Sequence, residues 1–154
     1  MKNVFNTPFE TLLRVLLILS ENEEQIKTAD MIAAVDFIAV YGKLFRITDN
    51  NLNGDRAFSF SEFTARRELV KRALKRLVLD GLVIFLQQDK GFCYKISETG
   101  KTYCASLNSD YSYEYTTAAK AASTYVGTKS EREVFAEISQ HSLLALRKGE
   151  RNGR

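Results

Sequence analysis

The sequence predicts a single α+β domain in which helices predominate, and three observations lead to this fold class. The stretch from Glu62 to Val83 has apolar residues at helical spacing on one side, basic residues on the other, and an Asp80-Gly81 pair where the helix should end. An apolar run of strand length, Leu82–Leu86, follows at once, and Phe92–Ile96 returns after a turn. Helical patterns flank this unit on both sides. Helix, turn and strand in this order predict a winged helix-turn-helix with a two-stranded wing and additional C-terminal helices.

Length and composition fit one globular domain. The chain has 154 residues, of which 45% are hydrophobic and 27% charged, with 8 Gly and 1 Pro. We assign residues 1–146 to one winged-helix domain with a C-terminal helical extension, and residues 147–154 to a basic tail that we expect to be disordered. The longest apolar run is too short to span a bilayer, and the first ten residues lack a signal-peptide pattern. We therefore expect a cytoplasmic protein with no membrane partner.

The first two helices carry clear start signals. Thr7 and Glu10 form a capping box around Pro8, and we expect Arg14 to lie on the outside of the helix that follows. Its expected core residues are Phe9, Leu12, Leu13, Leu16 and Leu17. Thr28 predicts the cap of a second helix, residues 29–41. Asp36 lies in the middle of that helix, where it is either exposed at the surface or paired with an arginine of the cationic helix.

The loop before the central helix resembles a calcium-binding loop only in part. Asp49, Asn51, Asn53 and Gly54 match its first half, but the twelfth position, which should be a bidentate Glu, is Phe60. We interpret this segment as a polar turn. The phenylalanines after it are interpreted as packing residues.

The central helix presents the candidate binding residues of the chain. Its core face consists of Leu69, Val70, Ala73, Leu74, Leu77 and Val78. Its outer side and flank, together with the turn of the wing, supply the residues that we expect to bind a partner or DNA: Arg66, Arg67, Lys71, Arg72, Lys75, Arg76 and Lys90. A solvated helix face without a ligand is the alternative.

The distribution of charge bears on the choice between protein and DNA. Four of the 22 basic residues and one of the 19 acidic ones lie in residues 147–154, so residues 1–146 carry 18 of each and are neutral overall. A domain that binds duplex DNA on its own usually has a net basic footprint. The outer helix face is also poor in the Asn, Gln, Ser and Thr side chains that read base edges, which favours phosphate contact over base readout.

The rest of the chain predicts a hairpin and three further helices. Gln88–Gly91 is a turn between the two strands of the wing, and Gly100 in the next helix is interpreted as a packing residue. The expected helices cover residues 97–107, 110–126 and, after a Ser130/Glu133 capping box, 131–146.

The chain offers no set of residues typical of catalysis or of a cofactor site. Cys93, Cys104 and the single histidine, His141, are too few and too far apart in sequence for a metal framework. Cys93 falls in a predicted strand among apolar neighbours, and we interpret both cysteines as reduced, partly buried thiols. We therefore expect no catalytic residues, cofactor or metal.

An ordered series of short motifs spans most of the chain. The motifs are Asn6-Thr7-Pro8-Phe9-Glu10, Val35-Asp36-Phe37, Arg66-Arg67, Gly81-Leu82-Val83, Gly91-Phe92 with Tyr94, Glu98-Thr99-Gly100 and Tyr125-Val126. In this series the chain resembles the small middle component of the bacterial ABC-three-component systems, which overlap the Lamassu-type anti-phage and anti-plasmid systems. Phe58-Ser59-Phe60-Ser61 stands where that family has a Leu-His-Pro-like stretch, so a role for that histidine is absent here.

The resemblance implies an accessory subunit without catalysis of its own, acting beside an SMC-like ATPase and an effector that is often a nuclease. We hypothesise that it links these two subunits, with DNA contacted through the complex. The alternative is a winged-helix transcriptional regulator whose central helix enters the major groove. A third hypothesis is that the cationic helix pairs with acidic residues of a partner protein.

Overall fold

The computed structural model describes residues 8–22, 25–52 and 60–152, with Phe60 and residues 143–152 described by their backbone alone. Helices predominate, and a small antiparallel sheet accompanies them. The elements are α1 (Pro8–Glu21), β1 (Lys27–Thr28), α2 (Ala29–Val40), α3 (Phe60–Leu79), β2 (Val83–Gln88), β3 (Gly91–Ile96), α4 (Glu98–Ala105), α5 (Asp110–Val126) and α6 (Glu131–Asn152).

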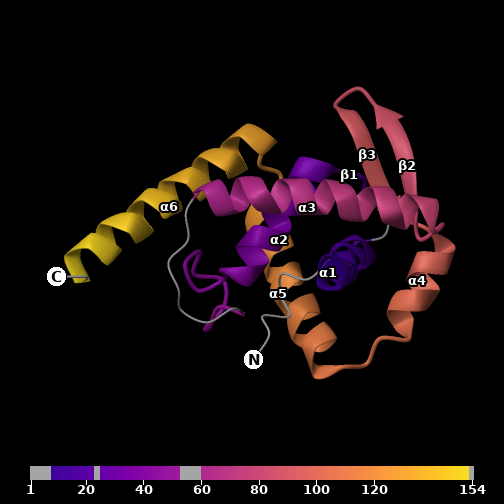
Figure 1. The fold of residues 1–154 in the computed structure, drawn as a ribbon, viewed down its shortest axis with the longest axis horizontal. Coiled ribbons are helices and arrows are strands. Elements are labelled where there is room, and N and C mark those ends of the chain that lie inside the picture. Colours follow the sequence, from indigo (N-terminus) through magenta and orange to yellow (C-terminus); the bar gives the residue numbers. More distant parts are fainter. Residues whose placement is uncertain (1–7, 23–24, 53–59, 153–154) are drawn as a thin grey trace.

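The helices α1, α2, α3 and α5 pack on one another around a common core. In Figure 1, α3 crosses the molecule above α1, which is seen nearly end-on, the β2–β3 hairpin rises near the C-terminal end of α3, and α6 passes the other end and projects outward. Residues 32–40 of α2 are all buried, because this helix contacts α3, α5 and α6. A helix that is apolar all round is the kind that suits such a central place.

The first helix begins at Pro8 as the sequence predicts, but two of its residues do not lie where we expected them. Phe9 is 59% exposed, and Arg14 is 1% exposed instead of lying outside. The buried apolar residues run from Val15 to Leu19 without a break, because α2, α3, α4 and α5 all contact α1. The Thr7 part of the expected capping box lies outside the described residues.

The caps of the other helices confirm the sequence prediction. Thr28 Oγ1 accepts a hydrogen bond from the Met31 amide at 3.2 Å at the start of α2. The amide of Leu82 donates to the carbonyl of Leu77 at 2.9 Å, and that of Gly81, at φ +78°, donates to Val78 at 3.1 Å. These two bonds form a Schellman motif, which ends α3 at the expected Asp-Gly turn.

The hairpin of β2 and β3 is confirmed, and a third strand joins it. The strand order is β1-β3-β2, with Lys27 opposite Tyr94 and Thr28 opposite Cys93. The sheet therefore has three strands, one more than the two-stranded hairpin that the sequence predicts. A two-residue strand has no periodicity that a sequence could show, so only its pairing with β3 reveals it.

The C-terminal helices follow the predicted order. Ser97, Ser109 and the Ser130/Glu133 capping box start α4, α5 and α6, and Gly127 ends α5. Helix α6 reaches Asn152, beyond the expected end near Leu146, because Gly149 is the one poor helix former between them. None of the helices in residues 8–22, 25–52 and 60–152 combines the length and hydropathy that a bilayer crossing requires.

Candidate functional site

The candidate site is built on α3, which presents one face to the core and one to solvent. Val70, Leu74 and Leu77 are at most 2% exposed and fix the rotation of the helix against α1 and α2. A helix held in this way must turn the residues between these positions outward. The basic residues of the sequence therefore fall into an outer set and an inner set.

Four basic residues form the outer set, which we call the basic face of α3: Lys71, Arg72, Lys75 and Arg76. All four are exposed, in agreement with the sequence prediction of an outward cationic side. Two of them make surface ion pairs, Lys71 with Glu68 at 3.7 Å and Arg76 with Asp80 at 3.0 Å. Exposed pairs of this kind are weak and screened, so their charges stay available to a partner.

Arg66 belongs to the inner set, which corrects its assignment to the binding surface. Its side chain is 4% exposed, and Nη1 lies 3.2 Å from Asp36 Oδ2. Glu62 Oε2 lies 3.6 Å from its Nε and also accepts a hydrogen bond from the hydroxyl of Tyr41. The guanidinium is therefore committed inside the protein and cannot reach a ligand in this conformation.

Arg67 is also engaged within the fold, although its side chain is 28% exposed. Its Nε and Nη2 donate to the two carboxylate oxygens of Asp30, both at 3.0 Å. The guanidinium carbon lies 5.0 Å from the ring centre of Phe135, a cation–π contact. The hydrogen bonds to Asp30 raise the pKa of Arg67. Arg67 thus joins α3 to α2 and α6.

Lys90 lies in the turn between β2 and β3, at the end of the hairpin away from α3. It is exposed, and its Nζ lies 3.4 Å from the carbonyl oxygen of Ile26. This contact places it beside β1, so the structure does not bring Lys90 together with the basic face of α3.

An apolar surface follows the basic face along the chain. Phe85 and Phe92 are 44% and 59% exposed, and their ring centres lie 5.0 Å apart on paired strands. Leu79, the last residue of α3, is 75% exposed, and Ile84 is 39% exposed. We call the side chains of Phe85 and Phe92 the apolar patch, because Ile84 precedes Phe85 on the same strand and therefore points to the opposite face of the sheet. Exposed apolar groups of this size, next to polar ones, are typical of protein–protein contact.

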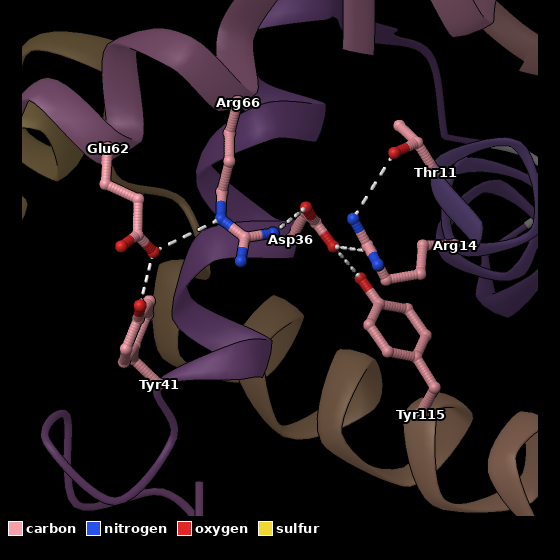
Figure 2. A network of polar contacts seen from close by, with 7 residues as sticks. All are labelled: Thr11, Arg14, Asp36, Tyr41, Glu62, Arg66 and Tyr115. Carbon is pink, nitrogen blue, oxygen red and sulfur yellow. Dashed lines mark hydrogen bonds and ion pairs between the residues drawn. The ribbon is translucent and has the colours of Figure 1, made fainter. Parts of the chain in front are cut away.

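A buried ionic network anchors α3, and Figure 2 shows its members converging on Asp36. Asp36 is 1% exposed. Its Oδ1 accepts hydrogen bonds from Arg14 Nε at 2.9 Å and from the Tyr115 hydroxyl at 2.5 Å. Oδ2 faces Arg66, so α1, α2, α3 and α5 all contribute a side chain. Of the two alternatives for Asp36, surface exposure and pairing with an arginine of the cationic helix, the structure shows the pairing.

Burial and charge oppose each other at this carboxylate. Burial alone would raise the pKa of Asp36, but the charges of Arg14 and Arg66 and the hydrogen bond from Tyr115 hold it below its ordinary value. Burial also opposes the charge of Arg14, whose pKa is nevertheless raised by Asp36. Burial and then the Asp36 charge raise the pKa of Tyr115 well above its ordinary value. The network is therefore an ionised carboxylate between two guanidinium groups, with a neutral tyrosine.

Sequence reasoning missed Arg14 and Tyr115 as members of the network. The signal for Arg14 was its place within an otherwise apolar helix, where a charge has no solvent side to face. Tyr115 was assigned to a packing stripe from its helical spacing. That spacing accounts for the burial of its ring but does not show which group its hydroxyl binds.

The residues considered for metal or thiol chemistry include, where they are described, a turn residue and two free thiols. Asn51 accepts a hydrogen bond from the Lys43 amide at 2.9 Å, as befits a turn residue, while Asn53 and Gly54 lie outside the described residues. Cys93, in β3, is buried, Cys104 is partly buried, and both are free thiols. Within the described residues, no group of three or more His, Cys, Asp or Glu is placed to hold a metal ion.

Comparison with known proteins gives one family match. The family whose sequence model matches is described as ABC-three component (ABC-3C) system Middle Component 2, and the match covers residues 4–148. Searches of curated proteins and of solved structures found no match.

Proposed function

This chain belongs to the Middle Component 2 family of ABC-three component systems, and on that premise we propose that it is a non-catalytic subunit linking the ATPase of such a system to its effector. The system would act in defence against phages or plasmids, with an SMC-like ATPase and an effector such as a nuclease. The observation that carries the proposal is that the basic face of α3 and the apolar patch are both exposed to solvent.

The chemistry of these two surfaces favours a protein partner. The basic face attracts acidic side chains, while the apolar patch gains free energy only when another apolar surface covers it. DNA offers phosphates for the basic face but little for exposed phenylalanines outside a base stack. A partner surface that is acidic in one part and apolar in the next matches both.

We further propose that the core of the fold is a winged helix adapted to this docking. The elements α1, β1, α2, α3, β2 and β3 follow in that order, and the antiparallel sheet has β3 in the middle. In this proposal α3 occupies the position of a recognition helix, and its basic face serves a partner subunit.

The decisive experiment is co-purification with the products of neighbouring genes. The wild-type chain should associate with the ATPase or effector at low and moderate salt, and the double variant Lys71→Glu, Lys75→Glu should lose about tenfold or more in affinity, because each reversal replaces an attraction by a repulsion. The matched control is Lys120→Glu with Arg132→Glu, which makes the same change in net charge at exposed positions of α5 and α6. Failure of the wild type to associate with either product would refute the proposal.

A DNA-binding regulator remains the second candidate, because the four cations of the basic face are spaced along one exposed helix side. If phosphates are the target, the same double variant should abolish DNA association and flatten its salt dependence. A DNA affinity that is unchanged in the double variant would remove α3 from any role in DNA binding.

A further inference from the structure

The two edges of the sheet differ in how they are protected from pairing with another chain. Strand β1 forms one edge and is only two residues long, and a very short edge strand is a common means of preventing such pairing. Strand β2 forms the other edge over six residues, VIFLQQ, without a charged residue or a proline. Its register with β3 runs unbroken from Val83 to Gln88, so no bulge interrupts it. The β2 edge therefore lacks the features that usually prevent pairing.

The outer side of β2 carries backbone groups that no strand of the described residues pairs with. The amide of Ser97 donates to the carbonyl of Leu82 at 3.1 Å, and these two residues continue the register of β2 and β3. Residues of an antiparallel ladder alternate between those that bond to the neighbouring strand and those whose N–H and C=O point away from it. Because Leu82 bonds toward β3, the backbone groups of residues 83, 85 and 87 point outward.

The edge is open to solvent beyond the first residue of the strand. Ile84 and Phe85 are 39% and 44% exposed, and Gln87 and Gln88 are also exposed. Figure 1 shows β2 on the outer side of the hairpin, with no helix running beside it. Outward-pointing backbone groups on an exposed apolar strand bind another extended strand, because its N–H and C=O groups continue the ladder.

We propose that this strand is the β2 of a second copy of the chain, paired antiparallel about a two-fold axis that passes between the two Phe85 residues. In this register each Phe85 faces the other, and Val83 faces Gln87 of the second copy. On the other side of the sheet Ile84 faces Leu86. Residues whose backbone groups point outward thus meet one another, so all of them become paired. Apolar side chains meet on both sides of the sheet, and no charged residue of β2 faces another.

A second copy fits this edge for two reasons. A two-fold interface needs a surface that is complementary to itself, and an uncharged strand with an unbroken register meets this condition. In the proposed register the exposed turn residues Asp89 and Lys90 of the second copy come level with the end of α3. Arg76 and Asp80 are exposed there, so each end of the interface holds charges of both signs.

The pairing also stops at two copies. It joins the two sheets into one of six strands, and both edges of that sheet are then the short strand β1. A closed dimer is therefore expected, and no open fibre. Such a dimer would form from this chain alone, so it does not depend on the proposed partner subunits.

The test is the mass of the purified full chain, measured by sedimentation equilibrium over a range of micromolar concentrations. The wild type should reach twice the 17.5 kDa of one chain. Phe85→Lys places like charges opposite each other at the two-fold axis and should weaken the dimer about tenfold or more. Phe92→Lys is the matched control, because it makes the same change on the same side of the sheet but on β3, away from the edge.

The control variant should dimerise like the wild type. A wild type that stays monomeric would leave the edge to a strand of another protein and overturns the proposal. Equal weakening by Phe85→Lys and Phe92→Lys also overturns it, because the contact would then be made by the face of the sheet and not by its edge.

A charge swap tests the register itself. Phe85→Lys and Phe85→Glu should each be monomeric at concentrations where the wild type is a dimer. An equal mixture of the two should recover the dimer, since each lysine then faces a glutamate. Position 85 meets itself only in the proposed register, so a mixture that stays monomeric overturns the proposal.

Gln87→Pro tests the backbone pairing without adding charge. It removes an N–H that points outward and leaves the ladder to β3 intact, so it should weaken the dimer about threefold or more without changing the circular dichroism spectrum. If the Phe85 variants do not fold, Gln87→Pro decides alone. A dimer as tight as that of the wild type in Gln87→Pro overturns the proposal.

Discussion

At the scale of single residues, Tyr115 shows how a buried hydroxyl depends on its ionised neighbour. It is 0% exposed, and its one polar atom donates to Asp36 at 2.5 Å. Tyr111 stacks beside it with the ring centres 6.2 Å apart. A hydrogen bond from a neutral donor to a buried carboxylate is stronger than one between neutral groups, because little water competes for either partner. The phenol must therefore stay protonated for the network to hold.

Replacing Tyr115 by Phe tests this dependence through pH. The substitution should reduce the free energy of unfolding by about 1.5–3 kcal/mol near neutral pH, the usual worth of a hydrogen bond to a charged group. The folded pKa of Tyr115 is raised, so its contribution is complete below the unfolded pKa of about 10 and is lost as pH rises toward the folded pKa. The wild type should thus lose stability more steeply than the variant above about pH 10, by up to about 1.4 kcal/mol per pH unit.

The measurement is urea unfolding of both proteins between pH 7 and 11, in the range where each refolds. Tyr113→Phe is the matched control because Tyr113 is 79% exposed, and it should follow the wild type. Parallel pH curves for the wild type and Tyr115→Phe would contradict the structure of the network.

At the scale of elements, the junction of α3, β2 and α4 is built from close backbone contacts. Ser97 Oγ donates to the carbonyl of Gly81 at 2.7 Å and accepts from the amide of Gly100 at 3.0 Å. The amide of Ser97 also donates to the carbonyl of Leu82 at 3.1 Å. One serine therefore caps α4 and ties it to the turn that ends α3, which positions the hairpin relative to the basic face.

The junction predicts the effect of Gly100→Ala. A Cβ at this position would lie 2.3 Å from the carbonyl oxygen of Leu82 and 2.7 Å from Cγ1 of Ile96, and the first of these is backbone. Alanine normally stabilises a helix relative to glycine by about 1 kcal/mol, but overpacking of this kind typically costs about 1–3 kcal/mol. We expect net destabilisation, measured as a lower urea midpoint. Thr99→Ala, exposed in the same helix, should change the midpoint little, and an unchanged or higher midpoint in Gly100→Ala would contradict the packing described here.

Elements with a chemical start or stop signal could be predicted from the sequence. These signals pair the free backbone groups at a helix end with residues only a few positions away, so a short stretch of sequence is enough to predict that end. Examples are Thr28, the Ser130/Glu133 box and the Asp80-Gly81 turn. Strand β1 carries no such signal, because its two residues become a strand only through pairing with β3.

The candidate site was predictable only in part for a related reason. Hydrophobic periodicity placed Lys71 and Arg76 outside correctly, since residues opposite a core face must be exposed. It could not show that Arg66 and Arg14 turn inward, because the cause is a carboxylate on another helix. The polar side of α3 was therefore recognised as a whole, while its division into an outer set and an inner set depends on tertiary structure.

At the scale of the whole molecule, the Asp36 network is the place where four helices are joined by charge. It links α1, α2 and α5 to the inner side of α3, whose outer side is the proposed docking surface. Residues that fix α3 from within therefore set the position of the residues that a partner meets. We therefore propose that the network affects partner binding through the position of α3, without contacting a ligand itself.

Asp36→Ala tests that coupling. The substitution leaves the guanidinium groups of Arg14 and Arg66 buried without their common counterion, a change that typically costs about 3–5 kcal/mol. Asp80→Ala, which removes the partner of Arg76 in an exposed pair, should cost about 1 kcal/mol or less and is the matched control. The measurement is the free energy of unfolding in urea. A loss below about 1 kcal/mol in Asp36→Ala would show that the network does not stabilise the fold.

Replacing the three charged residues of the network together separates its effect on the stability of the protein from its effect on the position of α3. The triple variant Arg14→Met, Asp36→Leu, Arg66→Met leaves no charge in the network, so it should recover part of the stability that Asp36→Ala loses, although the Tyr115 hydroxyl still lacks its acceptor. Its α3, however, is held by packing alone, and without the directional hydrogen bonds the helix has more freedom to shift along its axis. If the network positions the basic face, the triple variant should be more stable than Asp36→Ala and still bind its partner subunit more weakly than the wild type. Wild-type affinity in a stable triple variant would limit the network to stability, and the docking surface would then depend on the apolar core alone.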